Sequence, residues 1–151
     1  MELAFSANES SRIDAAGLTD SEILTLVTIL QHILPHERLD AQVYRDAVIG
    51  LAGQVGADPG RRRMIRYGVA ALNAPYAWLD LSFEDQRAGL EAIEDSDFFK
   101  TLRTAALERV YRDERTWELV GYEGEAIRFG GYLHRGFNDI DWLPDPGKAE
   151  K

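Results

Sequence analysis

The chain has 151 residues, a formal net charge of −9 at pH 7, and 45% hydrophobic and 28% charged residues. This length and composition are typical of one soluble globular domain with a single core, and the negative charge disfavours nucleic acid and anionic membrane surfaces as partners. The absence of cysteine excludes disulfides, thiolate catalysis and zinc–cysteine sites, and no apolar run approaches the roughly 18 residues that span a bilayer.

Three helices are predicted between residues 19 and 72. Thr19 and Glu22 have the spacing of a capping box, and the apolar pattern behind them continues to Leu34, where Pro35 ends the helix. A second helix is expected from near Asp40 to Leu51, with two glycines after it. The third begins at 58–59, Asp-Pro. The inward-facing residues of the three helices are Ile23, Leu24, Leu26, Val27, Leu30, Ile33, Leu34, Val43, Tyr44, Ala47, Val48, Leu51, Met64, Ile65, Gly68, Val69 and Leu72.

Two further helices are predicted after a loop at residues 73–82, which we expect to bury its aromatic side chains. Ser82 and Ser96 are suitable N-cap residues for these helices. Their apolar residues are Phe83, Ala88, Leu90 and Ile93 in the first and Phe98, Phe99, Leu102, Ala105, Ala106 and Val110 in the second. No stretch alternates with a period of two, so the prediction is an all-α domain, a compact bundle of about five helices.

The segment 118–144 differs from the rest because it lacks helical periodicity and is rich in glycine and aromatic residues. Its five glycines are Gly121, Gly124, Gly130, Gly131 and Gly136, and its aromatics are Tyr122, Phe129, Tyr132, Phe137 and Trp142. Glycine permits close approach of another surface, and aromatic residues dominate interface energetics. The segment therefore wraps over its own helices, onto another protein, or both. We expect Tyr122, Gly124, Phe129, Tyr132, Phe137 and Trp142 to contact a partner.

The expected domain organisation follows from these patterns. Residues 1–17 are polar and predicted to be flexible, 18–146 form a single helical domain that includes the partner-binding tail 118–146, and 147–151 are predicted to be flexible. The N-terminus lacks a basic region followed by an apolar one, so no secretory signal is expected in this chain.

Candidate catalytic and metal-binding groups are weak. His32 and His36 have the i, i+4 spacing of a metal-binding pair, but Pro35 lies between them, which favours surface or cap histidines. The tail carboxylates Glu123, Glu125, Asp139 and Asp141 have no nucleophile set around them, so an acidic rim is favoured. The glycines do not form a dinucleotide-binding fingerprint. The arginines Arg61, Arg62, Arg63 and Arg66 form either a solvated helix face, which is favoured, or a contact with phosphate or an acidic partner.

Several short motifs, in order, resemble the gluconate 2-dehydrogenase subunit 3 family. They are ILPHE at 33–37, Ser82-x-Glu84-x-Gln86, Asp97-Phe98-Phe99, and Gly121-Tyr122-x-Gly124 within GYEGEA at 121–126. The resemblance extends over about residues 18–146. It implies a non-catalytic small subunit that binds, stabilises and helps mature or export the FAD-containing catalytic subunit of a sugar, glycoside or polyol dehydrogenase complex.

The resemblance also implies the partners and the location. The large subunit would be a flavoprotein of the glucose-methanol-choline type, with a cytochrome c subunit in some complexes; this chain would carry no cofactor, and the complex would be periplasmic. This chain departs from the family because it shows no twin-arginine signal, so a cytoplasmic location stays open. The alternatives are a free-standing helical ligand-binding or regulatory domain and, less favoured, a hydrolase that uses the tail carboxylates.

Overall fold

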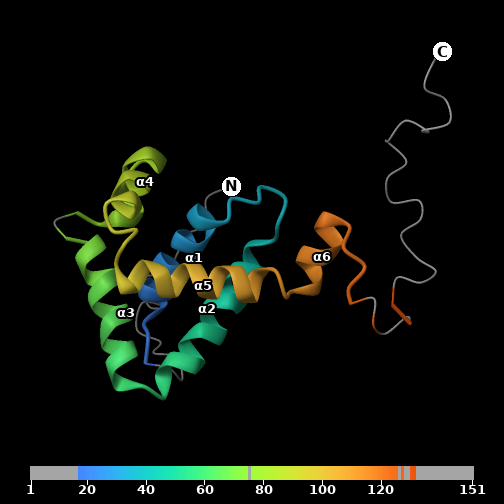
Figure 1. Ribbon diagram of the computed structural model, residues 1–151. Coiled ribbons are helices and arrows are strands. Elements are labelled where there is room, and N and C mark those ends of the chain that lie inside the picture. Colours follow the sequence, from blue (N-terminus) through green and yellow to red (C-terminus); the bar gives the residue numbers. More distant parts are fainter. Residues whose placement is uncertain (1–16, 75, 126, 128–129, 132–151) are drawn as a thin grey trace, which may run out of the picture.

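The computed structural model describes residues 17–74, 76–125, 127 and 130–131, and this part of the chain is all-α, as its sequence predicts. Along the chain the elements are α1 (Asp20–Ile33), α2 (Ala41–Gly56), α3 (Pro59–Leu72), the 3-10 turn η1 (Trp78–Asp80), α4 (Phe83–Glu91), α5 (Asp97–Val110) and α6 (Glu114–Val120) (Figure 1). None of these helices has both the length and the apolar character that crossing a membrane requires.

Side-chain caps set where the helices begin. At α1 both halves of the predicted capping box are present: the Glu22 N–H donates to Thr19 Oγ1 over 3.2 Å, and the Thr19 N–H donates to Glu22 Oε2 over 2.8 Å. The predicted caps of α4 and α5 are also confirmed, because Ser82 and Ser96 accept backbone N–H groups. Each of these bonds satisfies a helix-terminal donor that has no partner within the helix.

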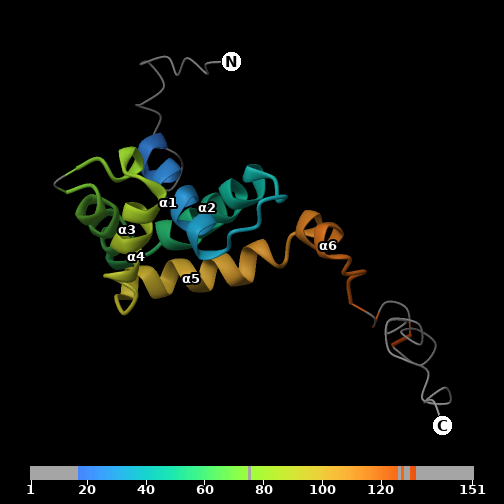
Figure 2. The ribbon, with the colours of Figure 1, turned by 90° about the horizontal axis from the view of Figure 1, so that it is seen from above.

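The core lies where α1, α2 and α5 meet. In Figures 1 and 2, α5 runs across α1 and α2. The side chains at this junction include Ile29, Leu30, Val48, Leu102, Ala106 and Val110, all with no exposed surface. The third helix packs closely on α5 at Gly68, where a Cβ atom would collide with the Phe98 ring. α4 lies near the start of α5 and α6 beyond its end, so the two short helices occupy opposite ends of the bundle (Figures 1 and 2).

Helix α2 continues one and a half turns beyond its predicted end at Leu51. It includes Gly53 and ends at Gly56. The reason is tertiary, because Ala52 and Val55 in this extension are buried at 4% exposure and belong to the core. Packing of the apolar face offsets the roughly 1 kcal/mol that glycine costs inside a helix.

The region before and within α4 differs in part from the prediction. Trp78 is buried in η1, whereas Tyr76 is 71% exposed, so the expectation of a loop that buries its aromatics is right for one residue and wrong for the other. Phe83 is also mostly exposed, although it was assigned to the apolar face of its helix; its ring stacks on His32 with centroids 4.5 Å apart. A sixth helix, α6, was not predicted at all, and it takes in the first residues of the supposedly irregular tail.

Candidate partner-binding site

Local signals at both ends explain why α6 forms. Asp113 caps its start by accepting the Arg115 N–H over 2.9 Å. At the other end Gly121 takes the left-handed conformation, with φ of 73°. The Tyr122 N–H then donates to Trp117 O over 2.8 Å, and the Gly121 N–H donates to Glu118 O. This pair of bonds is a Schellman motif, which ends a helix and satisfies its last carbonyls.

The aromatic segment therefore begins as a helix cap rather than as irregular chain. The Tyr122 and Trp117 rings meet edge to face, with centroids 5.4 Å apart and planes at 88°, which is the apolar contact that accompanies a Schellman motif. Residues 118–120, assigned to the irregular tail by sequence, lie in the last turn of α6. A seven-residue helix is too short to show a periodic pattern, but Asp113 and Gly121 are the start and stop signals that could have revealed it.

Polar contacts fasten α6 to the bundle. The Arg115 guanidinium lies 2.6 Å from both Asp46 Oδ2 on α2 and Asp113 Oδ2, and these hydrogen bonds lower the pKa of both carboxyls below its ordinary value. The Trp117 indole N–H donates to Tyr111 O over 2.6 Å. Thr116 is completely buried. The Arg115–Asp46 contact joins the short helix to α2, and the Trp117 indole joins it to the end of α5.

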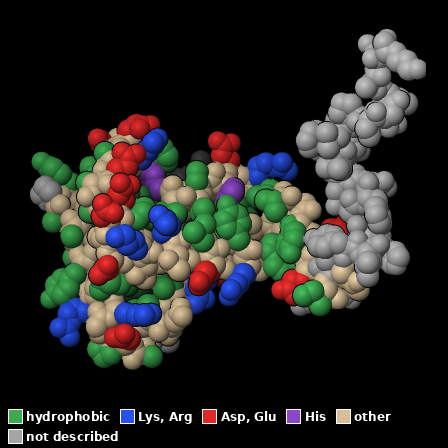
Figure 3. All heavy atoms as spheres, in the orientation of Figure 1, with side chains coloured by type: hydrophobic (Ala, Val, Ile, Leu, Met, Phe, Trp, Pro, Cys, Tyr) green, Lys and Arg blue, Asp and Glu red, His purple; other side chains and the backbone are tan. Residues whose placement is uncertain are grey.

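Four apolar side chains on and beside α6 are exposed. Tyr111, Val120, Tyr122 and Ile127, which we call the apolar tip, expose 40%, 57%, 45% and 83% of their surface. Figure 3 shows hydrophobic side chains gathered where α5 passes into α6. Large apolar residues that are exposed near one another are typical of an interaction site, whereas single exposed ones are ordinary; these four lie within residues 111–127 of the chain, at the end of α5 and on and after α6.

Two of the six predicted partner-contact residues lie within the described part. Tyr122 belongs to the apolar tip. Gly124 has φ of 88°, and a Cβ atom there would lie 3.6 Å from Trp117 Cζ3, so glycine meets both a backbone and a packing requirement. The other four, Phe129, Tyr132, Phe137 and Trp142, lie outside the described residues. The structure thus brings Tyr122 and Gly124 together around Trp117, a residue that the sequence did not single out.

The two histidines contact different elements. His32 Nε2 lies 2.9 Å from Gln86 Oε1 on α4, and His36 Nε2 lies 3.0 Å from the Tyr111 hydroxyl after α5. Gln86 is buried and donates to Trp78 O over 3.1 Å, while the Trp78 indole N–H donates to Gln86 O over 3.3 Å. This polar network, which joins α1, η1 and α4, was not predicted from the sequence. Within the described part, no three His, Asp or Glu side chains come together as metal ligands would.

The remaining candidate groups are dispersed. Glu123 and Glu125 are exposed, and Asp139 and Asp141 lie outside the described residues. Among the arginines, Arg61 pairs with Asp58 over 3.6 Å and Arg66 with Glu22 over 3.0 Å. Arg62 departs from the expected solvated face, because it is half-buried and donates to Gly56 O.

Comparisons with protein-family models, with curated proteins and with solved structures return no match to this chain.

Proposed function

We propose that this protein is a non-catalytic small subunit that binds and stabilises the FAD-containing catalytic subunit of a sugar, glycoside or polyol dehydrogenase complex. The observation that carries the proposal is the apolar tip, displayed on a helix that Arg115 and Trp117 hold in place. The family resemblance of the motifs at 33–37, 82–86 and 121–126 supplies the nature of the partner. FAD would be bound by the partner, and this chain would contribute surface.

The apolar tip has the chemistry of an interface core. Tyr111 and Tyr122 are large, amphipathic side chains with few rotatable bonds, and such residues anchor protein interfaces. A definite backbone reduces the conformational entropy lost on binding, and the caps of α6 provide one. Phe129, Tyr132, Phe137 and Trp142 extend this surface in the proposal, so the tail would continue the contact that the tip begins.

The alternative is a free-standing ligand-binding domain, and among the described residues the core offers it little space; two larger hollows, of about 510 and 340 Å³, are open at the surface. Leu18, Leu26, Val48, Leu51, Ala52, Val55, Arg62 and Ile65 line a cavity of about 10 Å³. A space of this size holds about one water molecule, whereas pockets for organic ligands have volumes of roughly 300–1,000 Å³. Steps beyond binding, such as help with maturation or export to the periplasm, rest on the resemblance alone.

Copurification from the native source tests the proposal. We expect the tagged full-length chain to bring down a flavoprotein of the glucose-methanol-choline type in equimolar amount, as judged by mass spectrometry and light scattering. The complex should show a flavin absorbance band at about 450 nm, and the chain purified alone should lack it. Recovery of a monomer that unfolds cooperatively and whose melting temperature does not respond to the flavoprotein would contradict the proposal.

A further inference from the structure

We propose that a groove along α3 binds an extended, carboxylate-rich segment of a partner protein. The groove has a volume of about 510 Å³ and is lined by Glu22, Pro59, Arg62, Arg63, Arg66, Tyr67 and Ala70; we call it the α3 groove. The proposal does not depend on the proposed function, because the α3 groove and the apolar tip are separate surfaces on different helices. Figure 2 shows α3 and α6 at opposite ends of the bundle.

The lining of the α3 groove is positively charged. The groove lining contains three arginines and one glutamate, a formal excess of two positive charges in a chain whose net charge is −9. The glutamate is already engaged: Glu22 accepts from Arg66 Nε and, through its other oxygen, from the Thr19 N–H that begins α1. None of the ion pairs found in the described residues includes Arg62 or Arg63. Arg63 is exposed and available to an incoming carboxylate, whereas Arg62 is half-buried and donates to Gly56 O.

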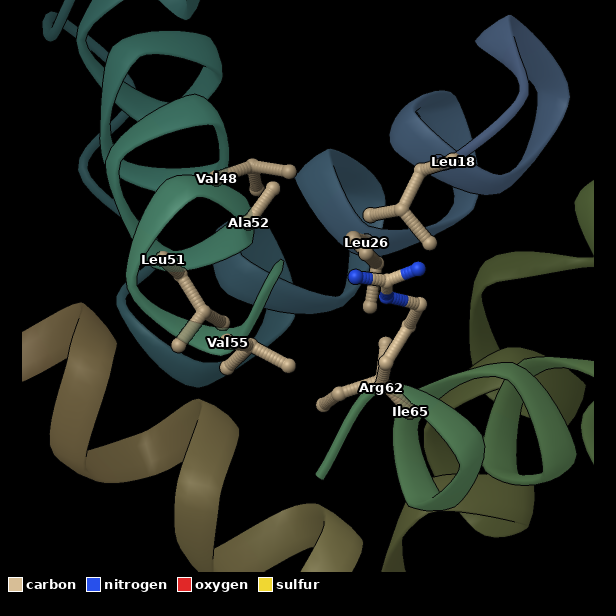
Figure 4. A pocket seen from close by; sticks show the side chains of 8 residues that line it. All are labelled: Leu18, Leu26, Val48, Leu51, Ala52, Val55, Arg62 and Ile65. Atoms are coloured by element: carbon tan, nitrogen blue, oxygen red, sulfur yellow. The ribbon is translucent and has the colours of Figure 1, made fainter. Parts of the chain in front are cut away.

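The Arg62 side chain is half-buried among aliphatic residues. Its guanidinium extends from α3 toward Leu18 and Leu26, across the small apolar cavity from Val55 (Figure 4). One side-chain nitrogen, Nη2, donates to Gly56 O, but Nε is buried and has no hydrogen-bond partner among the described residues. A cation held among aliphatic groups without a counter-charge is costly, and an anion bound nearby recovers part of that cost. The position of Arg62 therefore favours a negatively charged ligand.

The shape of the groove favours a chain segment over a small ion. Its lining runs along α3 from Pro59 to Ala70, about 16 Å at the helical rise, which matches roughly five residues of extended chain. Tyr67 is 68% exposed beside the arginines and offers an apolar surface that a single phosphate would leave uncovered. Arginine binds carboxylates with paired N–H groups. A nucleic acid is a poorer ligand, because its binding rests on many phosphate contacts and this lining offers only three arginines.

Fluorescence anisotropy with a defined peptide tests the assignment on the full-length chain. The probe is a labelled, amidated hexapeptide of alternating Glu and Asp, and the reference is its Gln/Asn counterpart. We expect the acidic peptide to bind, its affinity to fall with added salt, and the neutral peptide not to bind. Arg63→Glu should weaken binding at least about tenfold. Arg103→Glu on α5, an exposed site with the same change of charge, should alter it less than about twofold.

A second variant separates a binding role of Arg62 from a structural one. Arg62→Met keeps a long side chain but removes the cation, and with it the buried Nε that has no hydrogen-bond partner among the described residues, from the apolar cavity. We expect the urea midpoint of the variant to equal or exceed that of the wild-type chain, while peptide binding weakens about tenfold. A variant that unfolds more easily yet binds the peptide as before would show that Arg62 serves the fold alone and would overturn its part in the site.

Four results would overturn the assignment of an acidic protein segment. Equal effects of Arg63→Glu and Arg103→Glu would mean that binding follows net charge. Complete displacement of the peptide by sodium phosphate at constant ionic strength would assign the groove to a small anion. Tighter binding of a single-stranded DNA oligonucleotide than of the peptide would assign it to nucleic acid. Self-association in sedimentation equilibrium that Arg63→Glu abolishes would assign it to a second copy of this chain.

Discussion

The junction of α1, α2 and α5 and the short helix α6 are held in different ways. At the junction, Leu30, Val48 and Leu102 are completely shielded from water. By contrast, α6 is joined to the bundle mainly through the partly exposed Arg115 and through the Trp117 indole, and it carries exposed apolar residues. Burial of each large aliphatic side chain stabilises by about 1.5–3 kcal/mol, whereas exposed ion pairs contribute little.

The difference indicates that the buried junction of α1, α2 and α5 provides most of the stability, whereas α6 is suited to binding a partner. A region with few buried side chains opens at a lower free energy than the core does, and binding surfaces are drawn from such regions. We therefore expect changes in the core to affect unfolding and changes at the apolar tip to affect partner binding. Variants in the core and at the apolar tip test this division.

The largest effect is expected in the core. Leu102→Ala removes a completely buried side chain from the middle of α5 and should lower the free energy of unfolding by about 3 kcal/mol through lost burial and the resulting cavity. Leu107→Ala, on the same helix but 44% exposed, should cost less than about 0.5 kcal/mol. Urea unfolding measures both. Equal losses would mean that α5 is not buried as described.

The next effect concerns binding. Tyr122→Ala removes an aromatic anchor of the apolar tip, which should cost about 2 kcal/mol in affinity for the flavoprotein, roughly a thirtyfold loss. The matched control is Tyr76→Ala, since Tyr76 is more exposed and lies far along the chain, before η1. Calorimetric titration of the folded variants with the flavoprotein measures their affinities. If Tyr122→Ala lowers stability but binds as the wild-type chain does, the tip belongs to the fold and the interface lies elsewhere.

A smaller effect is expected from Gly121→Ala. The left-handed backbone at Gly121 costs a residue with a Cβ atom about 1 kcal/mol, so the Schellman cap should weaken. Hydrogen exchange should accelerate at the amides of α6 and stay unchanged in α1 and α2. Gly53→Ala is the control, because Gly53 lies inside α2 with open space where a Cβ atom would be; it should stabilise slightly. Faster exchange throughout the molecule would mean that α6 is part of the core's cooperative unit.

The smallest expected effect is the pH dependence of the folded chain's stability at acid pH. Hydrogen bonds from Arg115 lower the pKa of Asp46 and of Asp113 in the folded chain. Their contribution to stability is therefore present above the ordinary carboxyl pKa of about 3.9 and disappears as the pH falls through the lowered folded values. Arg115→Met should return both pKa values toward the ordinary one in a carbon-detected NMR titration, and it should reduce the acid-dependent loss of stability. Arg103→Met should leave both pKa values unchanged.

Local signals in the sequence were sufficient for most of the helices. Thr19 with Glu22, Asp58 with Pro59, and the serines at 82 and 96 each place a side-chain acceptor where a helix has unsatisfied N–H groups, and this chemistry acts within four residues. The apolar spacing behind these caps correctly identified most buried residues of α1 and α5, but Leu24, predicted to face inward, is 47% exposed. The helical fold class and several helix starts could therefore be predicted without knowing how the helices pack.

The candidate site was predicted less completely. The sequence singled out Tyr122 and Gly124 by composition, but it did not reveal that both pack against Trp117 or that α6 carries them. The contact between Arg115 and Asp46 joins residues 69 positions apart, and no local pattern indicates such a pair. The half-buried position of Arg62 depends on the cavity that α1 and α2 form opposite it.

Local sequence signals specify the helical fold class, the start of most helices, and which side chains are apolar enough to be buried. Packing of the helices against one another is what extends α2 through Gly53, leaves Tyr76 and Phe83 exposed while Trp78 is buried, and places Arg62 in an apolar cavity. The two sets of features differ in the range, along the chain, of the interactions that produce them. Caps and periodicity depend on neighbours within one or two turns, whereas burial and charge pairing depend on residues that meet only after the helices have packed.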